Sequence, residues 1–272
     1  MKVTPVRLLV ATLLAMGLLL VLAVTAAFAD HSWNGYHWAR TSNPFTLKLV
    51  DSVTSAWNSY LGGASADWTA SSMLDTAIVS GSDSSGTRKS CRAVLGYVRV
   101  CNSTYGNNGW LGIAQVWVSG DHIGQGVVKL NDTYFNTATY NKPAWRQYVT
   151  CQEIGHTLGL DHQDENFSNA NLGSCMDYTN DPDGSRYGQL DNTHPNQHDY
   201  DQLATIYAHT DGYTSASASS TKPGAAPAPN GHPSDEDFGA PAGKKDQKGR
   251  DILFVKNLGG GAKAFTWVFW AD

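Results

Sequence analysis

The apolar and polar positions divide the chain into an apolar start, a middle of short alternating segments and a C-terminal part in which a polar stretch precedes two short apolar segments. Residues 8–24 form a continuous apolar stretch after a basic start, and Ala27-Phe28-Ala29 is a small-x-small site. This combination is typical of a secretory signal peptide over residues 1–29, cleaved after Ala29. An uncleaved anchor is the alternative, because the stretch is nearly long enough to cross a bilayer. No later stretch is that long, so we expect no stable membrane span after cleavage.

Short apolar or alternating segments in the first half predict a sheet. We expect strands at residues 45–50, 77–80, 93–100, 113–118 and 127–130, and a helix at residues 51–60. Asn107-Asn108-Gly109 has the composition of a hairpin turn. Several strands with few helices indicate an α+β fold, although this pattern alone fits many such folds.

A second helix is predicted from Pro143, a good first helical residue because its missing N–H would have no partner there. Gln152 and His156 lie one turn apart on one face of this helix, and Glu153 lies beside them. Gly159 suits the left-handed residue that ends a helix, after which His162 can return toward His156. A bare Glu-x-x-His occurs often by chance, and the added glycine and second histidine make the pattern more specific.

These side chains have the chemistry of a catalytic zinc site. Imidazoles bind zinc, zinc lowers the pKa of water, and a nearby carboxylate can take its proton and pass it to a leaving amine. Glu153 would have that second role, with His156 and His162 as ligands.

The segment Glu153, His156, Gly159 and His162 resembles the metzincin metallopeptidases. Ser174-Cys175-Met176-Asp177-Tyr178 is similar to their Met-turn, with the tyrosine placed as in astacins, and residues 196–207 read as a capped closing helix, as in matrixins; snapalysin-like enzymes are another close pattern. The resemblance covers about residues 32–210. It implies a metzincin-like α+β catalytic domain with a twisted mixed sheet, active-site helix, Met-turn and C-terminal helix.

The resemblance also implies a function, namely a secreted zinc endopeptidase that acts on protein or peptide substrates. Met176 would support the site from below, and Tyr178 would help to stabilise the developing oxyanion. A substrate strand would pair with an edge strand, for which residues 113–118 are our candidate.

Gln152 departs from the pattern, because it stands where the first zinc-binding histidine is expected and an amide oxygen binds zinc poorly. Gln152 could be a weak third ligand, a water could fill the gap, or the site could lack metal. Asp161 is a lower-ranked substitute ligand. The rival interpretation is a catalytically inactive metzincin-like extracellular binding module, and a metal-dependent hydrolase of a non-peptide bond fits less specifically.

Four cysteines in an exported chain are expected to pair, and four allow three connectivities. We expect Cys91 with Cys101, bracing a strand region, and Cys151 with Cys175, tying the active-site helix to the Met-turn. Cys151 as a thiolate ligand is the weaker alternative, because it is offset by about 100° from Gln152 around the helix.

The amino-acid composition changes after His209. Residues 214–229 are rich in Ser, Ala and Pro, which is typical of a linker, and residues 251–258 and 264–270 read as two strands around a glycine turn. We therefore divide the chain into a peptidase-like domain at residues 30–210, a low-complexity linker at 211–250 and a hairpin-like segment at 251–272. Two strands are marginal alone, so the hairpin is expected to dock on the domain or on a partner.

Charge changes this picture little, since 19 Lys and Arg face 24 Asp and Glu and no basic cluster indicates nucleic acid. Asp121, Asp132 and the acidic residues 161–165 are candidate calcium ligands, although solvated loop charges are the simpler interpretation of each. Six further histidines show no ligand spacing: His31, His37, His122, His194, His198 and His209. The oligomeric state is not predicted.

Overall fold

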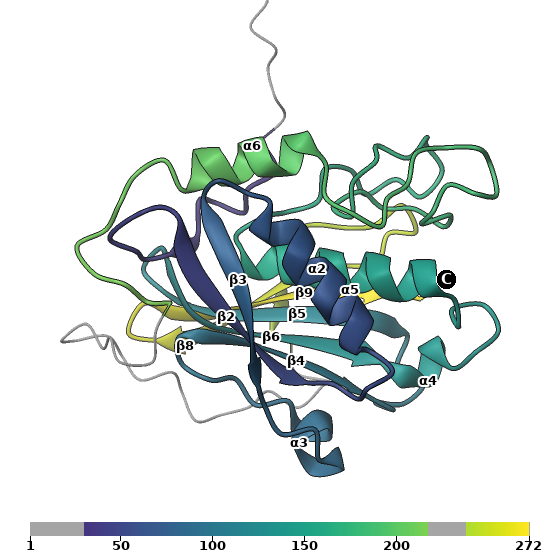
Figure 1. The fold of residues 1–272 in the computed structure, drawn as a ribbon, viewed down its shortest axis with the longest axis horizontal. Helices are drawn as coiled ribbons and strands as arrows, with labels where there is room; N and C mark the ends of the chain where they lie inside the picture. The colour runs from purple at the N-terminus through teal and green to yellow at the C-terminus, as the bar shows by residue number, and fades with distance from the viewer. Residues whose placement is uncertain (1–29, 217–237, 272) are drawn as a thin grey trace, which may run out of the picture. The chain divides into compact units, whose positions relative to one another are not determined.

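One mixed β-sheet organises the protein, and a computed structural model describes it for residues 30–216 and 238–271 (Figure 1). The expected signal peptide lies outside the described residues. The strands are β1 (His37–Trp38), β2 (Phe45–Ser52), β3 (Leu74–Ser80), β4 (Tyr97–Ser103), β5 (Trp110–Ser119), β6 (His122–Asn131), β7 (Ala240–Pro241), β8 (Leu253–Gly259) and β9 (Ala262–Trp270). The helices are α2 (Asn58–Thr69), α3 (Ser85–Ser90), α4 (Asp132–Phe135), α5 (Pro143–Thr157) and α6 (Gln197–Ile206).

The strands run in the order β3-β2-β4-β6-β5-β9-β8-β7, and β1 pairs with the start of β6. Pairs β2–β3, β2–β4 and β4–β6 are parallel, whereas β5–β6, β5–β9 and β8–β9 are antiparallel. The sheet is therefore mixed, as predicted, and the fold is α+β with few helices.

Two local predictions for the first half were wrong. The helix expected at residues 51–60 starts at Asn58, because β2 continues through Ser52 before a turn in which Asn102 accepts a hydrogen bond from the Thr54 amide. The sequence Asn107-Asn108-Gly109 does not join a hairpin, since β4 and β5 lie on opposite sides of β6. The hairpin joins β5 to β6 instead, with Gly120 at a positive φ of 62°.

Helices α2 and α5 pack together in front of the sheet (Figure 1). Trp68 of α2 is fully buried, and its indole N–H donates to the Cys151 carbonyl of α5 at 3.1 Å. A β-carbon on Gly155 would lie 2.7 Å from the Trp68 ring, so the missing side chain allows the two helices to approach closely. Helix α6 begins with the predicted Asn196 cap, which forms a capping box with Asp199.

The C-terminal strands are part of the same sheet. Strand β9 pairs with β5 from Trp110 to Ser119 and with β8 on its other side. Phe265, Trp267 and Phe269 of β9 are buried in the main core. The expected hairpin therefore docks on the domain rather than standing apart from it. Strand β5 is paired on both sides, so the expectation that residues 113–118 form a free edge for substrate was wrong.

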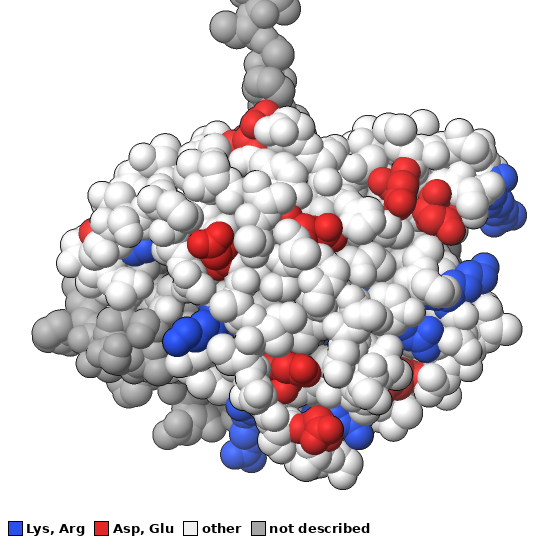
Figure 2. Space-filling model, in the orientation of Figure 1, with Lys and Arg blue, Asp and Glu red and all other residues white. Residues whose placement is uncertain are grey.

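The surface carries few charges. Figure 2 shows acidic and basic side chains scattered singly or in small groups over the face in front of α2, among a mostly uncharged surface. Within the described residues, no helix combines the length and apolar character needed to cross a bilayer.

Candidate metal centre

Helix α5 positions three of the predicted site residues, Gln152, Glu153 and His156, all of which are at most 1% exposed. Gly159 then takes a φ of 102°, and a β-carbon there would lie 2.5 Å from the Tyr36 carbonyl oxygen. Only glycine fits both constraints without strain. The turn that it permits brings His162 back to His156.

The two imidazoles meet at their outer nitrogens. Nε2 of His156 lies 3.0 Å from Nε2 of His162, and the rings are nearly perpendicular, with centroids 4.6 Å apart. Nδ1 of His156 lies 2.9 Å from the Leu160 carbonyl oxygen, which can only accept, so Nδ1 carries the hydrogen and Nε2 presents its lone pair. Two nitrogen atoms at this separation fit the spacing of two ligands of one metal ion.

Burial keeps both imidazoles neutral. It lowers the pKa of His156 to about 4 and the pKa of His162 well below its usual 6.5, with the neighbouring His156 ring adding to the effect on His162. Neutral imidazole is the form that binds metal. Nδ1 of His162 lies 3.8 Å from Asp161 Oδ1 and 3.9 Å from Glu165 Oε1.

Glu153 points toward the sheet, into space left by a glycine. A β-carbon on Gly112 of β5 would lie 2.6 Å from Glu153 Oε1, so any larger residue there would displace the carboxylate. Burial raises the pKa of Glu153 well above 4.5, and the backbone amide of Ala114 offsets only part of that rise. Neither carboxylate oxygen has a well-formed hydrogen bond among the described residues. Glu153 is therefore a buried carboxyl group whose oxygens lack well-formed hydrogen bonds to the described part of the protein.

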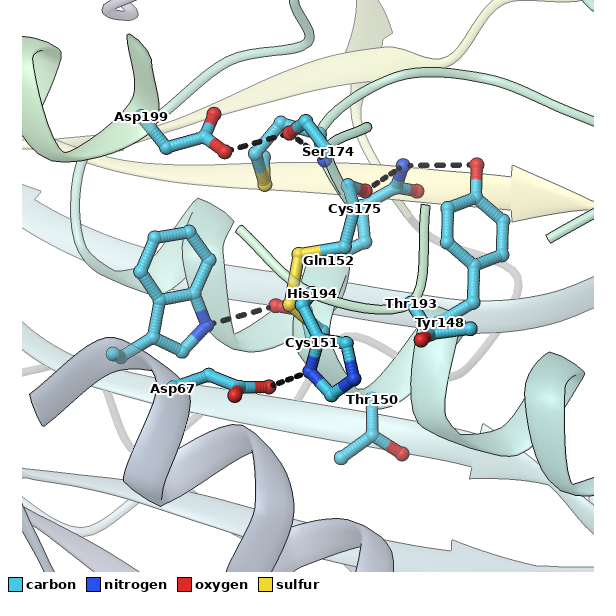
Figure 3. Close-up of a disulfide and its surroundings, with 12 residues drawn as sticks. Asp67, Tyr148, Thr150, Cys151, Gln152, Ser174, Cys175, Thr193, His194 and Asp199 are labelled. Carbon is cyan, nitrogen blue, oxygen red and sulfur yellow. Dashed lines mark hydrogen bonds and ion pairs between the residues drawn. A yellow bond between two sulfur atoms is a disulfide. The ribbon is translucent and has the colours of Figure 1, made fainter. Parts of the chain in front are cut away.

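Gln152 is held by the Met-turn. Its amide nitrogen donates to the Cys175 carbonyl at 2.8 Å and lies 3.4 Å from the Tyr148 hydroxyl (Figure 3). Its Oε1 atom is buried without a partner in the described part of the chain. The amide nitrogen thus fixes the side chain, and the amide oxygen is free to bind another group.

Both disulfides have the predicted connectivity, Cys91 with Cys101 and Cys151 with Cys175. The second joins α5 to the Met-turn directly beside Gln152 (Figure 3). Met176 is fully buried, and a β-carbon on Gly155 would lie 2.5 Å from its sulfur. The turn therefore packs closely under the helix at the level of the imidazoles.

Tyr178 stands against the second imidazole, with ring centroids 4.4 Å apart. It is 2% exposed, and burial raises the pKa of its hydroxyl well above 10. The phenol is therefore neutral, and it can donate a hydrogen bond but not act as a base near neutral pH.

Strand β9 and the segment before β8 cover the site, which the sequence pattern did not reveal. Trp267 stacks on the His156 ring at 5.1 Å with an interplanar angle of 14°. Lys244 Nζ lies 2.5 Å from Asp161 Oδ2, one residue before His162. Phe269 contacts the Tyr178 ring at 5.1 Å. His156 and His162 are only 1% and 5% exposed as a result.

A nearby surface hollow of about 290 Å³ does not reach this centre. Seven residues line it, and neither imidazole nor Glu153 is among them: Phe167, Ser168, Asn169, Thr179, Asn180, Tyr187 and Gln189. The site is closed in the conformation described, because Glu153, His156 and His162 are at most 5% exposed.

Comparisons with known proteins give limited help. No family model matches the chain, and no curated protein matches it in sequence. One similar solved structure is high choriolytic enzyme 1 (HCE-1), a hatching enzyme zinc-protease from the medaka fish Oryzias latipes. The match has a TM-score of 0.38 and 11% identity, and it covers 65% of this chain and 96% of that chain.

The two imidazole nitrogens, 3.0 Å apart, fit one zinc ion, and Gln152 Oε1, one helical turn before His156, is buried without a hydrogen-bond partner in the described residues. Asp161 does not face this point as a free ligand, because one oxygen contacts Lys244 and the other accepts the His162 amide at 2.9 Å. Glu153 does not join the two imidazoles in a cluster of ligand atoms within 4.8 Å in the described residues, which suits a base better than a ligand.

Calcium at the acidic residues is not supported. Asp132 accepts hydrogen bonds from the Trp57 indole at 2.9 Å and from the Asn102 amide at 2.5 Å. Asp121 contacts His122, and Asp161 contacts Lys244. Asp161 and Glu165 lie within 4.8 Å of each other and of a His162 nitrogen, but Lys244 contacts both carboxylates, and an imidazole is not a ligand that calcium prefers.

Proposed function

We propose that the protein is a secreted zinc-dependent endopeptidase in which Glu153 is the general base. The observation that carries this proposal is the meeting of the His156 and His162 Nε2 atoms at 3.0 Å, with an unsatisfied buried carboxylate one turn away. A purely structural pair of imidazoles would leave Glu153 as a buried acid with only the Ala114 amide to offset the cost of its burial.

Each side chain has a defined part in the reaction. His156 and His162 would hold zinc, with Gln152 Oε1 as the candidate third ligand, held in place through its amide nitrogen. The metal would supply Lewis acidity, which lowers the pKa of water. Glu153 would accept the proton of that water and later donate it to the leaving amine, for which its raised pKa is suited. The neutral Tyr178 hydroxyl is a hydrogen-bond donor for the developing oxyanion.

Cleavage of a protein substrate requires the C-terminal strand to move. Strand β9 occupies the edge of β5 where the substrate strand was expected to pair, and Trp267 covers His156. We infer that the described conformation is a closed form, in which the chain's own strand stands where a substrate would bind.

Export fits this function. The apolar start of the chain and the two disulfides both favour an oxidising compartment.

A catalytically inactive extracellular binding module is the second candidate. Its motivating observation is the combination of Gln152 in a ligand position with two imidazoles that are at most 5% exposed. The two functions differ in one measurable property, which is cleavage by a zinc-loaded chain.

The test is zinc content and casein cleavage by the full chain, by Glu153→Gln and by Asp201→Asn, an exposed carboxylate on α6 that serves as control. We expect Glu153→Gln to keep its zinc and to lose cleavage by at least about 100-fold, with Asp201→Asn unchanged. Equal cleavage by Glu153→Gln and the native chain would contradict the proposed base. Zinc binding without cleavage, also in the variant Lys244→Glu that is expected to loosen the C-terminal cover, would favour the binding module.

A further inference from the structure

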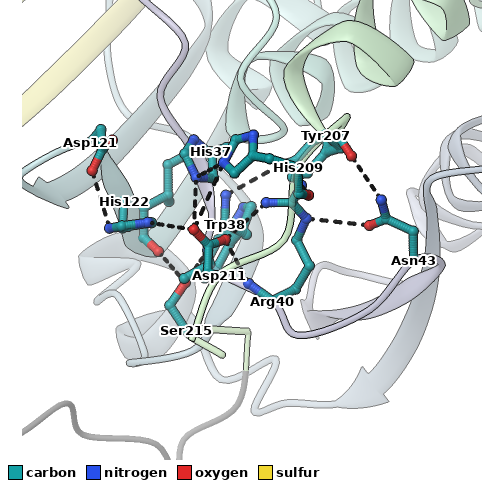
Figure 4. A network of polar contacts seen from close by, with 12 residues as sticks. His37, Trp38, Arg40, Asn43, Asp121, His122, Tyr207, His209, Asp211 and Ser215 are labelled. Carbon is teal, nitrogen blue, oxygen red and sulfur yellow. Dashed lines mark hydrogen bonds and ion pairs between the residues drawn. The ribbon is translucent and has the colours of Figure 1, made fainter. Parts of the chain in front are cut away.

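Three side chains of metal-ligating type, His37, His122 and Asp211, have ligand atoms within 4.8 Å of one another, and His209 adjoins two of them (Figure 4). Nε2 of His37 lies 3.1 Å from Nε2 of His209 and 3.6 Å from Asp211 Oδ1. Nε2 of His122 lies 3.1 Å from the same oxygen, and Nε2 of His209 lies 3.8 Å from it. These residues are separate from His156 and His162.

The fold brings the four residues together through backbone pairing. In the parallel β1–β6 pair His37 is the direct partner of His122. The segment after α6 is tied to the same place, because the Asp211 amide donates to the Arg40 carbonyl at 2.7 Å and the Ser215 amide donates to the Ala39 carbonyl at 2.8 Å. The cluster therefore joins the N-terminal segment, the central sheet and the chain beyond the last helix.

The opposite sides of His37, His122 and Asp211 are also held. Nδ1 of His37 lies 2.7 Å from the Gly35 carbonyl oxygen, and Nδ1 of His122 lies 3.2 Å from Asp121 Oδ1. The other oxygen of Asp211 accepts hydrogen bonds from Arg40, at 2.9 Å from Nη1 and 3.1 Å from the amide. Carbonyl and carboxylate partners of this kind orient the imidazoles of metal sites and fix their tautomer.

Nδ1 of His37 donates to the Gly35 carbonyl, so its Nε2 presents a lone pair to the cluster. Within the protein this lone pair can accept from His209 Nε2, and His122 Nε2 can donate to Asp211 Oδ1. A metal ion would take the place of both hydrogens, because it binds the lone pairs of neutral imidazoles and a carboxylate oxygen.

We infer that His37, His122, His209 and Asp211 form a second metal site. Ligand atoms around a tetrahedral zinc ion lie about 3.3 Å apart, given bonds of about 2.0–2.1 Å, and four of the six separations among these ligand atoms run from 3.1 to 3.8 Å. Three imidazoles and one carboxylate select a zinc-type ion over calcium or magnesium, which prefer oxygen ligands. Four protein ligands leave no position open for substrate, so the ion is structural.

The site would stabilise the fold rather than take part in peptide cleavage, and it does not depend on the proposed function. His37 and Asp211 are largely buried, with side chains 3% and 10% exposed, whereas the His122 and His209 side chains are 21% and 52% exposed. The two more exposed rings are therefore the ones to replace, because their loss leaves no cavity in the core.

The experiment measures bound zinc in the full chain, in His122→Ala/His209→Ala, in His156→Ala/His162→Ala and in His194→Ala. His194 is the matched control, since its side chain is 55% exposed and it also contacts a carboxylate, Asp67, at 2.8 Å. We expect the first double variant to hold one zinc fewer than the native chain, and His194→Ala to hold as much as the native chain. If the first double variant binds as much zinc as the native chain, the inferred site is wrong. Loss confined to His156→Ala/His162→Ala would likewise overturn it while supporting the proposed function.

His209→Ala alone guards against a double variant that does not fold. Saturating zinc should raise the Tm of the native chain and of His194→Ala, and the affinity of the second site should fall by at least about 100-fold in His209→Ala. A zinc-dependent Tm that is identical in His209→Ala and the native chain would contradict the assignment.

Discussion

The two imidazole clusters of this protein are built in opposite ways. His156 and His162 are six residues apart on one helix and its terminal bend, lack a third imidazole, and lie under Trp267. The cluster around Asp211 takes its side chains from three distant segments, combines His37, His122 and Asp211 with the adjoining His209, and is partly open to solvent. A metal site that leaves a ligand position open beside a base is typical of catalysis. A metal ion with four protein ligands is typical of a structural site.

The first prediction adds a third imidazole to the cluster of His156 and His162, which tests whether that cluster binds metal. Gln152→His places an imidazole where the buried amide now stands, so it should raise zinc affinity at the first site by about 100-fold, the upper range for losses at ligand-supporting residues. Competition with a zinc chelator measures this change.

Gln147→His is the control, because Gln147 lies on the same helix and contacts Asp67 at 3.4 Å. It should leave affinity at both sites unchanged. Unchanged affinity in Gln152→His as well would show that position 152 does not face the metal.

Much of the first cluster was predictable from the chain and little of the second was. The positions of Glu153, His156, Gly159 and His162 follow from one helical turn and one left-handed residue, which local spacing encodes. The Cys151–Cys175 pairing was expected for the same reason, since it ties two local motifs together.

The contacts between residues far apart in the sequence depend on which strands pair and in which register. The hydrophobic periodicity of a segment does not encode either. His37 meets His122 only because β1 joins β6 in one particular register. The residues of β9 carry an ordinary strand pattern, and nothing in it shows that β5 is their partner or that Trp267 lies on His156. The hairpin expected at Asn107-Asn108-Gly109 failed similarly, because β6 separates β4 from β5.

A second prediction uses the close contact between α5 and the Met-turn, which only the first cluster depends on. Gly155→Ala would place a β-carbon 2.5 Å from the Met176 sulfur and 2.7 Å from the Trp68 ring. Overpacking of this kind should lower the free energy of unfolding by about 1–3 kcal/mol, measured by urea denaturation. It should weaken zinc binding at the first cluster and leave the second unchanged.

Gly62→Ala in α2 is its matched control, because no atom lies within 4 Å of the added carbon and alanine favours the helix by up to about 1 kcal/mol. Gly155→Ala with native stability would show that the Met-turn is not packed against α5 as described.

A third prediction concerns access. Lys244→Glu replaces an ion pair with Asp161 and Glu165 by like-charge repulsion, which should loosen the C-terminal cover. We expect casein cleavage to rise about tenfold, equivalent to about 1.4 kcal/mol. Lys245→Glu is the control, since Lys245 contacts Asp251 within the C-terminal segment itself. An equal response of the two variants would remove the argument that the cover holds the site closed.

Anomalous X-ray diffraction at the zinc edge, from crystals of the full chain grown with zinc, tests the central claim most directly. We predict one peak between the Nε2 atoms of His156 and His162, within bonding distance of both, and a second peak among the three imidazoles around Asp211. A zinc-loaded crystal without density between His156 and His162 would contradict the proposed catalytic centre, whatever is found at the second site.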